Sequence, residues 1–226
     1  MSTVTKEYQP IRPAGRLMLT IGRDLIKSPS SALLELVKNA YDADAPDVAI
    51  SMVANRAKKS ICIVVEDHGH GMTNDVVKNI WLVPATGDKL QRKKSPKGRV
   101  MQGRKGVGRF ASAILGNSLL LETVADSVRT SVELNWNQFE DGRYLDEVKI
   151  PILKSTVKAG SGTKLTITGD EDYLEQWSEK QIDHVIYELK KLVPPELENE
   201  VGRKKNGKRG FEIKVRISGF GDRDRD

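Results

Sequence analysis

Residues 33–45 read LLELVKNAYDADA, a pattern typical of a helix with one apolar face and a polar side. The polar side carries Glu35, Asn39 and Asp42, whose i, i+4 and i+7 spacing places them along one helical face. A carboxylate, an amide and a second carboxylate in a row suit general-base chemistry beside a metal-bound phosphate. An ordinary amphipathic helix with a solvated polar side is the alternative, and this stretch alone does not separate the two interpretations.

A second segment begins with the apolar run at residues 61–65, which is rich in β-branched side chains and predicts a buried strand. The run leads into Asp67, and Gly69 and Gly71 follow at alternate positions. An acid at the end of a buried strand can accept a hydrogen bond from an exocyclic amine, and glycines let a flat ring come close to the backbone. The structural alternative is a tight turn in which Asp67 caps a helix that begins near Thr73.

A glycine-rich loop made by Gly103, Gly106 and Gly108 precedes a helical stretch that ends near Gly116. Backbone N–H groups at the start of a helix form an anion site, and glycines let a phosphate approach them. Three basic side chains of the same segment add positive charge: Arg104, Lys105 and Arg109. Two better-known phosphate motifs do not fit. Residues 98–105 lack the Lys-Ser/Thr pair of a P-loop, and the glycine spacing is the reverse of the dinucleotide fingerprint.

The fourth segment, SGTKLTIT at residues 161–168, alternates and predicts a strand. It gains weight only from its position after the other three. In this order, the segments resemble the GHKL superfamily of ATPases, which includes gyrase B subunits, heat-shock chaperones of the ninety-kilodalton class, histidine kinases, MutL-type repair proteins and MORC proteins. The matching motifs are Glu35-x-x-x-Asn39-x-x-Asp42, Asp67-x-Gly69-x-Gly71, Gly103-x-x-Gly106-x-Gly108 and Gly162-Thr163. The resemblance extends over residues 16–168, most of the chain.

The resemblance implies a role for each matching residue. Glu35 would be the general base that activates the attacking water, and Asn39 would be the Mg²⁺ ligand that ties the metal to the triphosphate. Asp42 would support the site without reacting. Asp67 would accept a hydrogen bond from the adenine amino group, helped by a water that Thr163 holds.

Other matching residues would surround the base and the phosphates. Gly71 and Met72 would pack against the adenine and its sugar side, next to Gly69. The backbone of the glycine loop would wrap the phosphates with Gly103, Arg104, Lys105, Gly106, Val107 and Gly108. A basic segment at residues 82–105 is similar to the flexible lid that closes over ATP. Lys89 in this segment resembles a lid lysine of MORC-like members, whereas a solvated basic loop is favoured for the other lysines.

Composition indicates one sizeable α/β domain, because 38% of the 226 residues are hydrophobic. No apolar run is long enough to span a bilayer, so no membrane partner is expected. The single cysteine, Cys62, lies in the predicted buried strand and indicates a reducing, cytoplasmic compartment. The net charge of +6 gathers in the lid and at residues 203–209. Such clusters can bind nucleic acid, but with 5% aromatic residues a solvated hairpin tip is the favoured interpretation.

The predicted architecture is α+β: a two-layer sandwich of the Bergerat type, with a mixed sheet, helices on one face and a flexible ATP lid. Besides the helix containing residues 33–42, helices are expected at 15–26, 74–81 and 178–192. Strands are expected at 48–53, 60–66, 118–124, 129–136, 147–153, 163–168 and 211–217. Residues 1–226 are predicted to form a single ATP-binding domain, the N-terminal part of a longer protein.

The expected function is Mg²⁺-dependent ATP binding and slow hydrolysis to ADP. Lid closure and ATP-dependent pairing of two full-length copies would make this a conformational switch. Glu35 argues against a histidine kinase, because kinases of the superfamily typically carry Asn at this position. None of the three histidines precedes the helix in a dimerisation hairpin. The remaining alternative is a regulatory module that senses ATP and barely hydrolyses it.

Overall fold

The computed structural model describes residues 6–26, 28–84, 93–103, 108–140, 142–192 and 210–225. It is built on a seven-stranded sheet in the order β5-β4-β3-β6-β2-β1-β7. The strands are β1 Asp47–Asn55, β2 Ser60–Asp67, β3 Ser118–Ala125, β4 Val128–Asn135, β5 Ile152–Thr156, β6 Gly162–Gly169 and β7 Glu212–Ser218. Strands β1 and β7 are parallel and all other neighbours are antiparallel, so the sheet is mixed.

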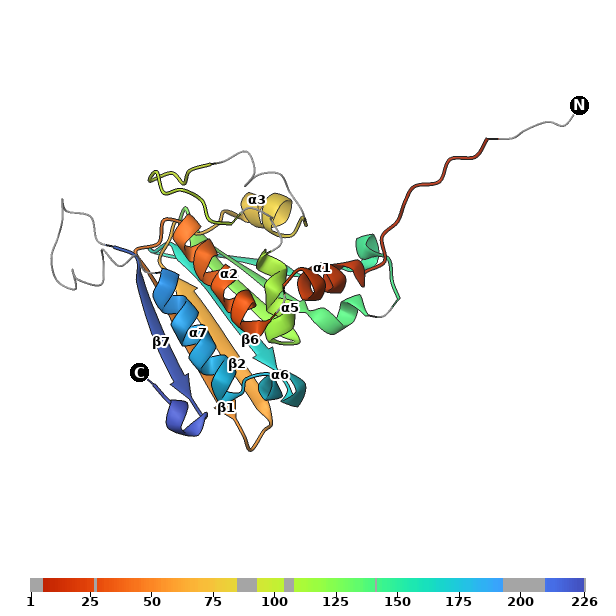
Figure 1. Cartoon of the computed structure of the whole chain (residues 1–226). Coiled ribbons are helices and arrows are strands. Elements are labelled where there is room, and N and C mark those ends of the chain that lie inside the picture. The colour runs from red at the N-terminus through yellow and green to blue at the C-terminus, as the bar shows by residue number, and fades with distance from the viewer. Residues whose placement is uncertain are drawn as a thin grey trace, which may run out of the picture.

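The helices gather on one face of this sheet, with α2 beside α7 and α5 (Figure 1). The helices are α1 Leu17–Leu25, α2 Pro29–Asp42, α3 Asn74–Val76, α5 Ser112–Leu115, α6 Glu171–Glu175 and α7 Glu179–Leu192. One layer of helices on one layer of mixed sheet is the α+β Bergerat arrangement that the sequence predicts.

Helix α2 is central to the helical layer. It begins where Ser28 Oγ accepts a hydrogen bond from Ser31 N at 3.2 Å, and Pro29 occupies its first position without losing a needed donor. One side of the helix is almost fully buried, as Leu33 and Val37 are 0% exposed. Burial of this face fixes the rotation of the helix, and with it the placement of the polar side chains.

The register of the sheet brings three polar residues into one row. Asp67 at the end of β2 lies opposite Thr163 on β6, and Thr163 lies opposite Thr123 on β3. Because side chains alternate along a strand, Asp67 lies on the same face as the buried Val65. Thr123 and Thr163 lie on that face of their strands as well, so the row belongs to the side of the sheet that the helices cover.

The predicted strand at 147–153 is wrong at its beginning. Leu145–Glu147 form a 3₁₀ turn, in which Tyr144 N donates to Glu147 Oε2 at 3.1 Å. Strand β5 begins only at Ile152, directly after Pro151. Proline has no N–H to donate to a ladder, which explains why pairing begins after it.

Two further predictions need correction. Cys62 is half-buried rather than buried, because β2 alternates between a covered and an open face. The helix predicted at 74–81 is α-helical only over Asn74–Val76 and continues as a π-helical turn over Val77–Trp81. Helix α6 was not predicted. Over the residues that the structure places, no helix combines the length and the apolar character needed to cross a bilayer.

Candidate active site

The end of β2 forms a hydrogen-bonded turn in which Gly69 and Gly71 are buried. Asp67 Oδ1 accepts from Gly69 N at 2.8 Å, and the next backbone donor, His70 N, reaches Ala43 O at 3.0 Å. The turn therefore packs against the C-terminal end of α2, four residues beyond Asn39. The structural alternative, in which Asp67 caps the following helix, is wrong. Thr73 caps this helix, accepting from Val76 N at 3.3 Å.

The pKa of Asp67 is raised to about 6. Burial is the main cause, because it disfavours the charged carboxylate. The backbone N–H groups of Gly69 and Thr163 act in the opposite direction, as do the neighbouring His70 and His68. A carboxylate desolvated to this extent gains from a ligand that brings a hydrogen-bond donor.

Thr123, which sequence reasoning missed, connects the three strands behind Asp67. Its hydroxyl donates to Gly162 O at 3.1 Å and accepts from Met72 N at 2.9 Å. It also lies 3.1 Å from Thr163 Oγ1. Since the one Thr123 proton goes to Gly162 O, the Thr163 hydroxyl donates in this contact and keeps its lone pairs for another donor, such as a water. The sequence pattern could have indicated Thr123, because it is a polar residue at an inward position of a strand whose other inward positions include buried leucines.

Two glycines of the β2 turn have a packing reason to be glycine. Gly71 has φ +66°, and a Cβ there would lie 1.9 Å from Val124 O. A Cβ on Gly69 would lie 2.6 Å from Ala43 O. No side chain fits at either position, whether or not a ligand also approaches this backbone.

The three polar residues of α2 have different environments. Glu35 is partly exposed and pairs with Lys38 at 2.8 Å, and Asn39 is half-buried. Asp42 is 4% exposed and accepts from Gln102 N at 2.7 Å and Gly103 N at 2.9 Å. Both Asp42 oxygens thus hold the backbone at the point where the glycine loop begins.

Several predicted residues lie outside the described residues: Lys89, Arg104, Lys105, Gly106, Val107 and the basic cluster at 203–209. Gly108 begins a short 3₁₀ segment that leads into α5, and the helix ends at Gly116 as expected. His68 Nδ1 lies 2.6 Å from Asp47 Oδ1, and His70 Nδ1 lies 2.6 Å from Gly71 O. Over the described ranges, no group of three or more His, Cys, Asp and Glu side chains is arranged to hold a metal ion.

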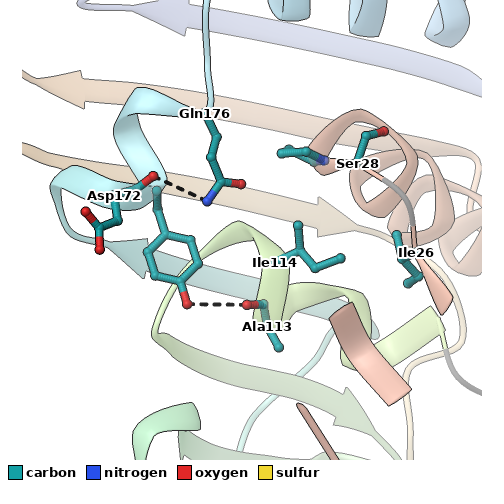
Figure 2. Close-up of a pocket in the computed structure, with 8 residues that line it drawn as sticks. Ile26, Ser28, Ala113, Ile114, Asp172 and Gln176 are labelled. Atoms are coloured by element: carbon teal, nitrogen blue, oxygen red, sulfur yellow. Dashed lines mark hydrogen bonds between the residues drawn. The ribbon is translucent and has the colours of Figure 1, made fainter. Parts of the chain in front are cut away.

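A separate cavity of about 410 Å³ lies near the N-terminal end of α2 (Figure 2). It is lined by Ile26, Ser28, Pro29, Ala113, Ile114, Asp172, Tyr173 and Gln176. Tyr173 Oη donates to Ala113 O at 3.4 Å along its wall. None of the predicted site residues lines this cavity, so the candidate active site is the β2 turn with the polar side of α2.

Comparison with known proteins agrees with this fold. A family model described as the histidine kinase-, DNA gyrase B- and HSP90-like ATPase matches residues 26–163, more than half of the chain. The chain therefore belongs to this family of ATPases, for which binding and hydrolysis of ATP is the general activity.

The curated relatives of the chain include chaperone proteins HtpG. The HtpG of Buchnera aphidicola subsp. Acyrthosiphon pisum is 26% identical over 183 residues, covering 72% of this chain and 28% of the relative. That of Geobacter metallireducens is 27% identical over 184 residues, covering 73% and 27%. That of Chlorobium phaeovibrioides is 26% identical over 210 residues, covering 83% and 32%. The chain thus spans about three-tenths of the length of these relatives.

Proposed function

We propose that this chain binds ATP together with Mg²⁺ and hydrolyses it slowly to ADP. The observation that carries the proposal is the row of Asp67, Thr163 and Thr123, which supplies a desolvated acceptor and a spare hydroxyl lone pair at the end of α2. Adenine has an exocyclic amino group that matches this acceptor. Placing the base there directs the phosphates along the end of α2 toward Gly103, where Asp42 fixes the backbone.

Asn39 is the residue that would hold Mg²⁺. Its amide oxygen is a hard ligand of the kind this ion prefers, and Mg²⁺ commonly takes one or two protein ligands and completes its shell with phosphate and water. The metal would neutralise charge on the phosphates. Glu35, one helical turn before Asn39 on the same face, then serves as the base that takes a proton from the attacking water.

A second candidate function is a module that senses ATP and barely hydrolyses it. It is favoured by one observation, the 2.8 Å ion pair of Glu35 with Lys38. A carboxylate held by a neighbouring ammonium is drawn away from an attacking water. The two functions share the binding site and differ only in whether Glu35 is released for chemistry.

Lid closure over the nucleotide and pairing of two copies belong to the same proposal. The similar HtpG proteins are named as chaperones and are more than three times as long as the matched region. We infer that this domain acts as the ATP-driven part of a comparable machine, with slow turnover when isolated. The basic cluster at 203–209 finds no support in the relatives as a nucleic-acid site, and none is proposed.

Replacing Glu35 tests the function directly. Glu35→Ala should retain affinity for an ATP analogue within about twofold and lose at least about tenfold in hydrolysis, because the base acts only in the chemical step. Glu66→Ala is the matched control, since this exposed glutamate lies on the open face of β2. Hydrolysis is measured as phosphate release. An unchanged, near-zero rate in Glu35→Ala and wild type alike would favour the sensing module instead.

A further inference from the structure

Residues 93–103, which we term the returning arm, lie along the C-terminal end of α2 (Figure 1). Arg99 lies near the middle of the arm. Its Nη1 donates to Tyr41 O at 3.1 Å and to Ala45 O at 2.7 Å. Its guanidinium lies 4.7 Å from the ring centre of Tyr41 and 5.7 Å from that of Phe211. The arm is therefore docked on the helix end by a cation that satisfies backbone carbonyls there.

Asp44 holds the arm at a second point, and it does so from an unusual backbone conformation. Its φ is +58°, in the left-handed region that favours glycine, yet the residue is 2% exposed and carries a charged side chain. Oδ1 accepts from Ser95 Oγ at 2.5 Å, and Oδ2 accepts from Lys97 N at 2.9 Å. Ser95 Oγ in turn accepts from Arg99 N at 2.9 Å.

The other end of the arm is held by Asp42, through Gln102 N and Gly103 N. Two carboxylates on the final turn of α2 and just beyond it thus fix both ends of the same segment. The segment runs directly into the glycine loop. By contrast, Asp67 and Thr163, the residues proposed to bind adenine directly or through a water, come from β2 and β6.

We propose that Asp44 is a positioning residue for the phosphate side of the site. By anchoring Ser95 and Lys97, it places the returning arm so that the glycine loop begins at a fixed point beside α2. Asp44 contacts the arm and acts on ATP only through it. The inference rests on the proposed ATP-binding function and adds a residue that controls how tightly the phosphates, rather than the base, are held.

Asp44→Gly separates the anchor from the fold, because glycine adopts the left-handed conformation readily while losing both hydrogen bonds. Lys59→Gly is the matched control. Lys59 also has a positive φ, +49°, but it lies in the β1–β2 hairpin at the opposite end of β1, where its exposed pair with Glu171 contributes little. Asp44→Asn keeps one acceptor for Ser95 and should give an intermediate result. Ser95→Ala breaks the same network from the arm if Asp44→Gly fails to fold.

The first readout is amide hydrogen exchange without nucleotide. In Asp44→Gly, the amides of Lys97 and Arg99 should exchange at least about tenfold faster, since their acceptors are lost or released. The second readout is calorimetric affinity for adenosine and for a non-hydrolysable ATP analogue with Mg²⁺. The analogue should bind about tenfold more weakly, while adenosine affinity stays within about twofold. Lys59→Gly should change neither readout.

Unchanged exchange at Lys97 and Arg99 in Asp44→Gly, or an equal loss of adenosine and analogue affinity, would overturn the positioning role. If the proposed ATP-binding function itself is wrong, the experiments give a different result. In that case the wild-type protein binds neither adenosine nor the analogue, although its arm amides are protected. A wild-type protein that binds both, with the same ratio of affinities in Asp44→Gly, rejects only the role of Asp44.

Discussion

Asp67 shows how one buried group gives the site its chemistry. The end of β2 removes its carboxylate from water, and two backbone N–H groups only partly compensate. The resulting pKa of about 6 leaves the group ionised at pH 7 but close to protonation. A donor from a ligand would stabilise the charged form, so the proposed recognition of adenine would be coupled to the desolvation of the acid through one hydrogen bond.

The affinity for adenosine should therefore depend on pH through Asp67. The ionised carboxylate accepts the hydrogen bond, so binding is strongest above the pKa and is lost as the pH falls through 6. Between pH 7 and pH 5 the affinity should fall about tenfold. Calorimetry with adenosine avoids the titration of phosphate groups.

Asp67→Asn provides the control for this experiment. Its adenosine affinity should be weak and nearly independent of pH, because asparagine does not titrate. A variant with the full wild-type pH profile would place the titrating group elsewhere.

Replacing Gly71 should lower the stability of the fold. Gly71→Ala combines a left-handed φ with a Cβ 1.9 Å from Val124 O, so the β2 turn must move. We expect a loss of about 3 kcal/mol or more in the free energy of unfolding. Gly142→Ala is the matched control, because Gly142 also has a left-handed φ of +72° but its Cβ would enter open space. There we expect a loss of only about 1 kcal/mol in the free energy of unfolding. Urea unfolding measures both, and equal losses would show that the contact with Val124 is unimportant.

At the scale of elements, the sheet and α2 meet at the β2 turn, and the register of β2, β6 and β3 builds the floor of the site. Thr123 is the connecting residue, because its hydroxyl serves the backbone of two other segments. An inward-facing hydroxyl next to leucines is retained where both its donor and its acceptor capacity are used.

Thr123→Val should therefore be costly in two ways. Removing the hydroxyl leaves Met72 N and Gly162 O without this partner, which should lower the free energy of unfolding by about 1–3 kcal/mol. Adenosine affinity should fall as well, because Met72 and Thr163 lose their shared anchor. The measurements are urea unfolding and calorimetry.

Thr130→Val is a close control on the next strand. Thr130 lies opposite Thr123 and is 0% exposed, but its buried hydroxyl has no hydrogen-bond partner within the described part of the chain. The same substitution there should be neutral or stabilising. If both variants lose equal stability, the Thr123 hydrogen bonds contribute nothing specific.

The elements also show what sequence could predict. Local spacing was enough to predict helix α2, the strands that alternate, and the position of Asp67 at the end of a strand with its two glycines in the turn that follows. The contacts of Thr123 with Thr163 and of Asp44 with Lys97 were not predictable, because they join residues 40 and 53 positions apart through pairing and docking. The π-helical turn at Val77–Trp81 likewise has no local periodicity that separates it from an α-helix.

For the whole molecule, the described helices and sheet form a two-layer domain of an ATPase family, with its candidate site where the layers meet at the end of α2. In the proposed site, the sheet would supply the side that binds adenine, and α2 would supply the metal ligand and the general base. The last turn of α2 also anchors the start of the glycine loop through Asp42. These parts come from segments far apart in sequence, so an assembled site requires the native fold. Binding to the folded form alone would stabilise it by mass action.

Calorimetric titration of the folded wild-type chain with a non-hydrolysable ATP analogue and Mg²⁺ is the most direct test. We predict saturable binding of one analogue per chain, which weakens when Asp67→Asn removes the adenine acceptor. The absence of any heat of binding, at several temperatures and with protein shown to be folded by circular dichroism, would contradict the assignment of this surface as an ATP site.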